Sequence, residues 1–392
     1  MSDAVAPHIL YGAPVSLYTG KARSYLRKQG IDFVEVSPGS DRYLNHVVPA
    51  VGRWIIPVVE TPYGELIQDG ASIIDHFEST GSTRYPAFPD TPAHRAVSHV
   101  FEMFGGEGLL RPAMHYRWSF DEQNIDFLRS EFALLTPRVD EATAAQGFDH
   151  NSGRMRRAAQ SFGVTPATMS TIEETFHEWL DLFSAHLVDH PYLLGDRPTL
   201  GDYGLMAAMW AHLFRDPAPA RLIKQRAPRV GRWVERMSTA EPDEVEYQRP
   251  PGASAELFAD DSVPDTLVSM LRYVADEYLA EITAHVSFAN EWLAERPELE
   301  AGTNGLKRPG DRGIGAAEFE WRGTRITTGV MPYRFWLMQR LHDAVESFDD
   351  AGQASVRSTF ATAGLEPLLD LRTDRRVERV GNLEVWGPTV DG

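Results

Sequence analysis

Residues 55–69 read IIPVVETPYGELIQD and hold a proline inside an apolar run. Proline cannot donate a hydrogen bond to a sheet ladder, so a strand that contains one is expected at an edge or beside a special turn. The run continues past Pro57 into a turn at residues 62–64 and reaches an apolar helix after Asp69. Such a site is one of the few that tolerates a cis peptide bond, and we predict one before Pro57. A cis bond would turn the main chain of Val58 outward, where its N–H and C=O groups could pair with a peptide-like ligand.

The residues before this stretch predict a strand–helix–strand unit. Residues 9–11 form a short apolar strand, residues 16–29 a helix that ends at Gly30, and residues 31–36 alternate apolar and polar side chains as a second strand. Short connections between such elements imply a parallel strand pair with a right-handed crossover. A short helix is expected over residues 41–47.

The quoted stretch itself predicts two more strands and a helix. Residues 55–59 and 65–67 are expected to pair through a tight turn, and Asp69 to cap a helix that buries Ile73, Ile74 and Phe77. The predicted order, βαβ followed by ββα, is the thioredoxin-like arrangement. We therefore expect a mixed α+β fold in which this domain occupies residues 1–85.

The remaining chain is expected to be mostly helical. Residues 93–240 predict an all-α domain, in which Thr199 and Asp202 have the spacing of a capping box. A segment rich in Pro, Asp and Glu, residues 241–262, reads as a linker. Residues 263–392 predict a mostly helical extension with hairpins near residues 319–326 and 377–386.

Composition excludes several classes of function. The chain has 392 residues, 43% hydrophobic and 24% charged, and a net charge of −18, which disfavours nucleic acids and anionic membranes as partners. No apolar run is long enough for a membrane span and no export signal is visible, so we expect a cytoplasmic protein. There is no cysteine, which rules out disulfides, Cys-based metal sites and a protein thiol nucleophile. Any thiol chemistry must use a thiol that arrives with a ligand.

The first 238 or so residues resemble the cytosolic glutathione transferases. The resemblance is carried by these segments in order: Tyr11-Gly12-Ala13-Pro14-Val15-Ser16, Lys21-Ala22-Arg23, Ile56-Pro57-Val58, Gln68-Asp69 with Ile73-Ile74, Leu194-Gly195 and Pro198-Thr199-Leu200-Gly201-Asp202. It implies a thioredoxin-like domain that holds glutathione, a helical domain that holds a second substrate, and a homodimer. It implies nothing about the role of residues 263–392.

The resemblance also implies roles for residues of the first domain. Ser16 falls where serine-type members keep the hydroxyl that hydrogen-bonds the glutathione sulfur, and Tyr11 and Thr19 are alternative hydroxyls. Other residues fall on or near the positions that bind the tripeptide: Arg53, Trp54, Ile56, Pro57, Val58, Gln68 and Asp69. Asp69 departs from the family pattern, which prefers a hydroxyl there. Its carboxylate would attract the γ-glutamyl ammonium and repel the adjacent α-carboxylate.

A dense polar and aromatic segment predicts a second-substrate site. The side chains are Arg111, His115, Tyr116 and Trp118, with His115 as a candidate acid or base. The alternative is that they only pack the domains together and form salt bridges. His186 and His190 lack a visible third ligand, and no metal is expected.

These observations favour an enzyme that activates the glutathione thiol. A hydroxyl at a helix N-terminus would stabilise the thiolate, which could attack a small hydrophobic or aromatic electrophile in conjugation, ether cleavage or isomerisation. The alternative is a non-catalytic, transferase-like binding or assembly module, favoured by Asp69 and by the long extension.

Overall fold

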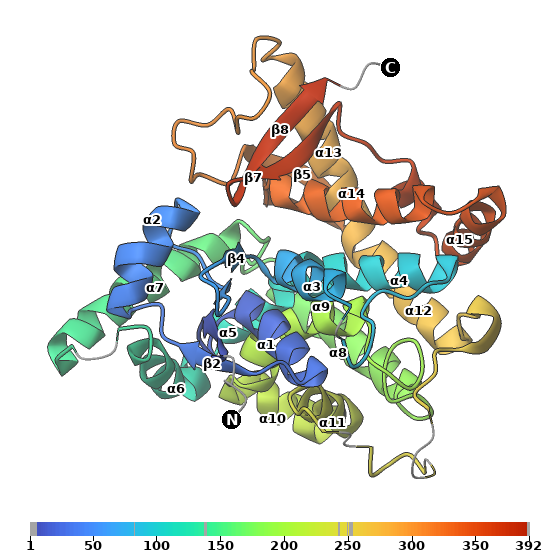
Figure 1. Cartoon of the computed structure of the whole chain (residues 1–392), viewed down its shortest axis with the longest axis horizontal. Helices are drawn as coiled ribbons and strands as arrows, with labels where there is room; N and C mark the ends of the chain where they lie inside the picture. Colours follow the sequence, from blue (N-terminus) through green and yellow to red (C-terminus); the bar gives the residue numbers. More distant parts are fainter. Residues whose placement is uncertain are drawn as a thin grey trace.

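The computed structural model describes residues 6–81, 83–136, 139–241, 244–248, 250 and 254–389. Figure 1 shows one end of the molecule formed by the N-terminal sheet and the helices around it, and the other formed by the C-terminal extension. Among the described residues, no helix combines the length and the apolar composition that crossing a bilayer requires.

The N-terminal domain has the predicted thioredoxin-like order. Its four strands pair in the order β2-β1-β3-β4, with β1 and β2 parallel and the other pairs antiparallel. The peptide bond between Ile56 and Pro57 is cis. The third strand begins after Pro57, later than expected, because proline has no N–H for the ladder. The elements are β1 (His8–Tyr11), α1 (Leu17–Gln29), β2 (Phe33–Val36), a π-helical segment (Tyr43–Val47), α2 (Val48–Val51), β3 (Val58–Glu60), β4 (Leu66–Gln68) and α3 (Gly70–Ser79).

The middle of the chain is helical, as predicted. The capping box forms, because the side chain of Asp202 accepts a hydrogen bond from the Thr199 N–H at 2.9 Å. The helices are α4 (Pro92–Met103), which continues into a π-helical segment (Phe104–Gly108), α5 (Leu110–Trp118), α6 (Asp121–Ala133), α7 (Glu141–Gln160), α8 (Met169–His186), α9 (Leu200–Ala208), which continues into a second π-helical segment (Met209–Phe214), α10 (Pro217–Arg226) and α11 (Pro228–Met237).

The extension contains both predicted hairpins and one helix that periodicity did not predict, α15. The first two helices of the extension are continuous through a π-helical segment (Ala275–Leu279) that lies between them. Its elements are α12 (Asp265–Val274), α13 (Ala280–Ala294), β5 (Gly315–Trp321), β6 (Thr324–Val330), α14 (Pro332–Glu346), α15 (Asp350–Thr362), β7 (Arg375–Val380) and β8 (Leu383–Thr389), with short 3₁₀ turns at Ala259–Asp261 and Glu366–Leu369. Of the linker read from the sequence, residues 242–243, 249 and 251–253 lie outside the described residues.

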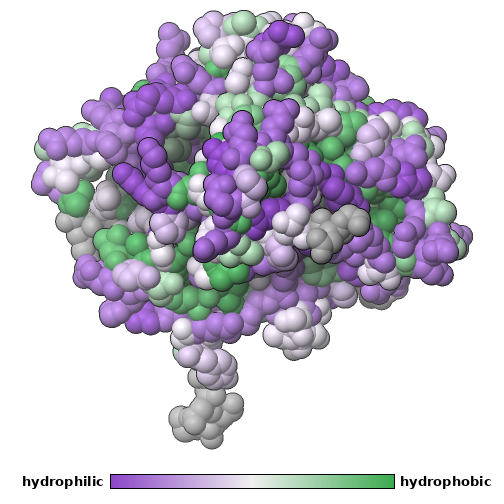
Figure 2. Space-filling view, turned by 90° about the horizontal axis from the view of Figure 1, so that it is seen from above, coloured by the Kyte–Doolittle hydropathy of each residue, from purple (hydrophilic) through white to green (hydrophobic). Residues whose placement is uncertain are grey.

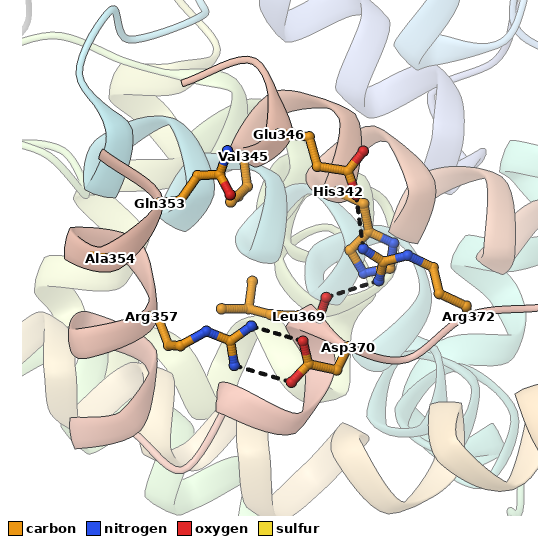
Figure 3. Close-up of a pocket in the computed structure, with 9 residues that line it drawn as sticks. All are labelled: His342, Val345, Glu346, Gln353, Ala354, Arg357, Leu369, Asp370 and Arg372. Carbon is orange, nitrogen blue, oxygen red and sulfur yellow. Dashed lines mark hydrogen bonds and ion pairs between the residues drawn. The ribbon is translucent and has the colours of Figure 1, made fainter. Parts of the chain in front are cut away.

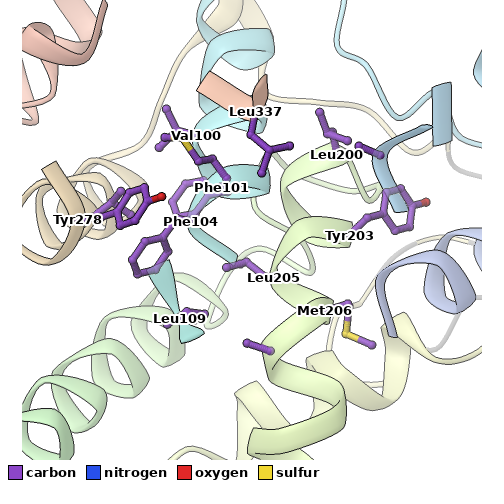
Figure 4. Close-up of a cluster of buried hydrophobic side chains, with 14 of the residues drawn as sticks. Val100, Phe101, Phe104, Leu109, Leu200, Tyr203, Leu205, Met206, Tyr278 and Leu337 are labelled. Atoms are coloured by element: carbon purple, nitrogen blue, oxygen red, sulfur yellow. The ribbon is translucent and has the colours of Figure 1, made fainter. Parts of the chain in front are cut away.

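The extension shares one hydrophobic core with the rest of the chain. Helix α14 lies along α4 (Figure 1), and Leu337 of α14 and Tyr278 belong to the same buried cluster as Phe101 and Phe104, as Figure 4 shows. Burial of large apolar side chains in one continuous cluster stabilises the parts against separation. The extension is therefore not an independently packed appendage.

Ion pairs also join the extension to the rest of the chain. Arg334 on α14 is 1% exposed and pairs with Glu107 at 3.0 Å and with Glu281 at 2.7 Å. Arg340, six residues further along α14, pairs with Asp75 of α3 at 2.6 Å. Seen from above in Figure 2, the outer face is largely hydrophilic, with hydrophobic areas between the polar side chains.

Candidate functional site

The predicted thiol-activating residue lies at the start of the first helix. Ser16 is half-buried and is the N-cap of α1, with its side-chain oxygen 3.4 Å from the N–H of Thr19. That distance is long for a hydrogen bond, so the hydroxyl is only weakly held by the cap. The N-terminal end of a 13-residue helix also favours a negative charge.

The two alternative hydroxyls are less accessible. Tyr11 is buried and donates a hydrogen bond to Glu60 at 2.8 Å, and burial together with Glu60 raises the pKa of Tyr11 to about 12. Thr19 is fully buried beneath Gly12, where an added Cβ would lie only 2.3 Å from its methyl group. Ser16 therefore offers the most accessible of the three hydroxyls.

Among the described residues, the unpaired main-chain groups beside Pro57 belong to Ile56, two residues before Val58, for which they were predicted. Val58 pairs with Tyr11 on one side and with Gln68 on the other, and the N–H of Asp69 donates to the carbonyl of Pro57 at 3.2 Å. That pattern makes Val58 and Gln68 a non-hydrogen-bonded pair, so the N–H and C=O of Val58 point to Tyr11. The prediction of an outward-facing Val58 is therefore wrong.

Ile56, just before the proline, has the main chain that Val58 was expected to offer. Within the described residues, neither its N–H nor its C=O has a hydrogen-bond partner. Its side chain is half-buried and packs on a cluster that includes Ala13 and Val15, which precede Ser16. An unpaired main-chain edge thus lies near the start of α1.

The two polar anchors at the end of β4 are buried. Gln68 is 3% and Asp69 7% exposed. Asp69 has φ of 89° and caps α3 by accepting the Ala71 N–H at 2.9 Å, as predicted. Aspartate is one of the non-glycine residues that adopt a positive φ most readily.

These anchors contact the C-terminal hairpin. Arg379 of β7 donates a hydrogen bond to the Gln68 side chain, and its guanidinium lies 3.4 Å from Asp69 Oδ1. Arg53 donates to both carboxylate oxygens of Glu384 in β8, at 2.9 and 3.0 Å, and to the carbonyl of Asn382 at 3.0 Å. Burial would raise the pKa of Glu384, but hydrogen bonding to Arg53 and the charge of Arg312 lower it overall.

Trp54 stays apart from these contacts. It is 52% exposed, and its ring lies edge-on to Tyr43 at 6.2 Å. The protein's own side chains therefore bind Gln68, Asp69 and Arg53. We call the site that these residues, Ile56 and Ser16 would form the proposed groove.

The four predicted second-substrate residues on α5 face different neighbours. Arg111 pairs with Glu281 of the extension at 2.7 Å and stacks on Trp321. Tyr116 is buried in a stacked contact with Phe120, with ring centroids 5.2 Å apart. Arg111 and Tyr116 therefore pack and form a salt bridge, as in the alternative in which these residues only hold the domains together.

His115 is committed to two hydrogen bonds. Its Nε2 lies 3.0 Å from Glu173, and its Nδ1 lies 3.0 Å from the Ser119 hydroxyl. Burial lowers the pKa of His115. The ring contacts no residue of the thiol-binding groove that we predict.

Trp118 alone of the four lies beside that groove. It belongs to a buried apolar cluster that reaches from the loop before Ser16 to the β5–β6 hairpin. Its members include Ala13, Val15, Met114, Trp118, Phe148 and Trp321, and Ile56 packs against the cluster. An apolar surface next to a thiol site suits a hydrophobic or aromatic electrophile.

Sequence reasoning missed Arg117, Arg379 and Glu384. Arg117 donates to the carbonyl of Val15 at 2.8 Å, directly before Ser16. Arg379 and Glu384 are more than 300 residues from their partners, so local spacing carried no signal for them. The sequence predicted only that a hairpin would form near residues 377–386.

A separate cavity lies within the extension. It measures about 340 Å³ and is lined by residues of α14, α15 and the segment that follows, including His342, Gln353 and Leu369. Figure 3 shows that Arg357 pairs with Asp370 there. None of its lining residues is one that the sequence predicted for glutathione.

Comparison with known proteins gives the family. Residues 10–84 match the profile of the glutathione S-transferase N-terminal domain, and residues 146–236 match that of the C-terminal domain. Residues 10–84 and 146–236 therefore belong to the two domains of the glutathione transferase family. Neither profile reaches the extension.

Solved structures of this family are similar but distant. A β-etherase from Sphingobium sp. strain SYK-6 is 17% identical, with 60% of this chain and 96% of that chain covered and a TM-score of 0.43. A glutathione S-transferase of Methylobacterium radiotolerans JCM 2831, in complex with glutathione sulfonate, is 19% identical, with 64% and 99% covered and a TM-score of 0.36. One from Xanthobacter autotrophicus Py2 is 22% identical, with 59% and 92% covered and a TM-score of 0.31. A search of curated proteins found no match.

Proposed function

We propose that this protein is a glutathione-dependent transferase in which Ser16 stabilises the glutathione thiolate. The observation that carries the proposal is the half-buried Ser16 hydroxyl at the N-terminus of α1, within a domain that matches the family profile. A free thiol has a pKa near ~8.5, so a donor to the sulfur and the helix dipole would both increase the thiolate fraction at neutral pH.

The reaction follows from that placement. The thiol proton leaves to solvent while the Ser16 hydroxyl donates a hydrogen bond to the sulfur. The thiolate then attacks an electrophilic carbon held against the apolar cluster at Val15 and Trp118, and a carbon–sulfur bond forms as the leaving group departs with its electron pair. Conjugation and ether cleavage share this step. The electrophile class that we propose is small and hydrophobic or aromatic.

The residues of the groove suit glutathione in part. The main chain of Ile56 could pair with the cysteinyl unit, Gln68 and Asp69 with the γ-glutamyl end, and Arg53 with the glycyl carboxylate. The negative charge of Asp69 suits the ammonium of that end and opposes its α-carboxylate. A cytoplasmic location and a homodimer are further expectations from the family.

Thermal unfolding with and without glutathione tests the proposal. A ligand at ~100 times its dissociation constant should add about 2.7 kcal/mol to the free energy of unfolding. Gln68→Ala should reduce that shift, while Gln123→Ala, a change of the same kind on exposed α6, should leave it unchanged. Turnover with an activated aryl halide should then require glutathione. A stabilised protein with no turnover for any electrophile class would contradict the catalytic part.

One observation favours the second candidate, a non-catalytic binding or assembly module. Gln68, Asp69 and Arg53, which should meet the two ends of glutathione, are bound by the β7–β8 hairpin. The test adds millimolar glutathione to the wild-type protein and to a variant without the hairpin contacts. If the unfolding temperature and the tryptophan fluorescence spectrum of both proteins stay unchanged, the binding or assembly module is the better description.

A further inference from the structure

The β7–β8 hairpin has a fixed base and a tip that reaches the N-terminal domain. At the base, the main chain of Val377 exchanges two 2.8 Å hydrogen bonds with the side chain of Gln339, and Trp386 lies in the hydrophobic core. At the tip, Gly381 and Asn382 have φ of 56° and 67°, which makes a tight two-residue turn. In Figure 1 the hairpin lies above β4 and α2.

The tip carries opposite charges to the two ends of the groove. Arg379 places a cation on Gln68 and Asp69, and Glu384 places a carboxylate on Arg53. The side chains of Arg379, Asp69, Arg53 and Glu384 are each 10% exposed or less, so both ion pairs are largely shielded from solvent. Partly desolvated, hydrogen-bonded pairs of this kind are stronger than exposed ones.

From this arrangement we propose that the hairpin tip is an internal ligand of the groove, and that a zwitterionic peptide thiol binds only after displacing it. The inference rests on the proposed function for the identity of that thiol. Glutathione offers the same two groups as the tip, an ammonium for the Gln68–Asp69 end and a carboxylate for Arg53. The tip already occupies Gln68 Oε1, Asp69 Oδ1 and the two terminal nitrogens of Arg53, so the tip and the peptide thiol compete for these groups.

The structure also provides a partner for the displaced carboxylate. Arg312 lies 3.9 Å from Glu384, and its Nε has no hydrogen-bond partner among the described residues. A Glu384 side chain that leaves Arg53 can therefore move to Arg312 without losing a cationic partner. The base of the hairpin stays in place, because its contacts to Gln339 and the core do not involve the groove.

The energetic consequence is a reduced apparent affinity. When only a fraction of molecules has an open groove, the measured dissociation constant equals the intrinsic one divided by that fraction. Removal of the tip contacts should restore the intrinsic affinity for the thiol, while the groove residues Arg53, Gln68 and Asp69 remain unchanged.

The test combines binding with a distance measurement. The double variant Arg379→Ala/Glu384→Gln removes both ion pairs of the tip, and Arg376→Ala is the matched control, because Arg376 is on the same strand and pairs with Asp343 of α14. Glutathione affinity is measured by calorimetry in the full-length protein. We expect an increase on the order of tenfold or more in the double variant and wild-type affinity in the control.

The absence of cysteine allows a second readout. Spin labels at Val380→Cys, on the hairpin tip, and Tyr63→Cys, on the β3–β4 turn, occupy exposed positions and report the distance between tip and groove. We expect one short distance without ligand and a longer, broader distribution with glutathione or in the labelled double variant.

Two results would overturn the inference, and they separate it from the proposed function. Equal affinity in wild type and double variant, with label distances that glutathione does not change, contradicts the internal ligand alone. A double variant with a released tip that still binds no glutathione contradicts the proposed function, and the inference falls with it.

Discussion

Arg117 Nη1 donates a hydrogen bond at 2.8 Å to the carbonyl oxygen of Val15, 102 positions earlier in the chain. The same guanidinium binds Asp216 through two hydrogen bonds of 2.6 and 2.8 Å and the carbonyl of Ala211 at 2.7 Å. All of these groups are buried, so the helical domain fixes the turn that precedes Ser16. Arg117 is a positioning residue for the proposed site rather than a group that touches the substrate.

Arg117→Lys should therefore reduce both stability and turnover. Lysine keeps the charge but cannot bind Asp216 with a planar pair of N–H groups while also reaching Val15. We expect a loss of about 2–4 kcal/mol in denaturant unfolding and a kcat that falls more than KM rises. Arg129→Lys, on exposed α6, is the control and should match wild type. A variant with wild-type turnover despite lost stability would show that the turn is held by other contacts.

Ser16→Ala should raise the pKa of the bound glutathione thiol and lower kcat, while glutathione affinity changes little. The hydroxyl is the proposed donor to the sulfur, whereas the cap that it provides is weak. The thiolate absorbance of the complex, followed against pH, measures this directly. Tyr11→Phe is the comparison, because the Tyr11 hydroxyl is already committed to Glu60. If Tyr11→Phe shifts the thiol pKa and Ser16→Ala does not, the assignment of the donor is wrong.

Arg334→Met should destabilise the whole chain rather than only the extension. The substitution leaves Glu107 without its buried cation and removes one of the two arginines on Glu281. Breaking a buried pair typically costs about 3–5 kcal/mol. Urea unfolding, followed by tryptophan fluorescence, should remain a single transition at lower urea. The exposed pair Arg357–Asp370 offers a control, since Arg357→Met should leave the midpoint close to that of wild type. A separate early transition would mean that the extension unfolds on its own.

His285 should contribute to acid sensitivity. Burial and the neighbouring cation Arg334 lower the pKa of His285 to about 3, despite the nearby Glu281 carboxylate. His285 is therefore protonated near pH 6.5 in the unfolded state but only near pH 3 in the folded state. The stability that is present above pH ~6.5 is lost as the pH falls toward 3. His285→Gln keeps hydrogen-bonding groups for Thr328 and Arg334 without titrating.

The free energy of unfolding, measured from pH 7.5 to 5, checks this expectation. The drop over that range should be smaller in His285→Gln by about 2 kcal/mol. His150→Gln, at an exposed position of α7, should follow the wild-type curve. Identical slopes in wild type and His285→Gln would show that His285 is protonated in the folded protein.

Local patterns predicted the N-terminal fold well because its signals are local. The alternation of residues 31–36, Gly30 after the first helix and Asp69 before the third each specify a short element through their own neighbours. The pattern could not give the ladder register, and so Val58 was expected to face a ligand when it faces Tyr11. Register depends on which strands meet, and that is decided by the whole domain.

The contacts of the extension were beyond such reasoning. No sequence pattern indicated a partner for Arg334, Arg340 or Arg379, although each forms an ion pair with a carboxylate more than 200 residues away in the chain. Helix α15 was missed because its sequence is rich in Ala, Ser and Thr and has few large apolar positions. The candidate site thus followed from family motifs, whereas the contacts of the β7–β8 hairpin with its residues became visible only in the three-dimensional structure.

Helix α4 carries a consequence for how this long chain could have arisen. Ten of its twelve residues are buried, among them His94, His99 and Glu102, because α14 and α15 cover the side that the first two domains leave open. A shorter ancestor that lacked residues 263–392 would have exposed that side to water. Relatives that lack such an extension should therefore carry a more polar set of residues on that side of α4.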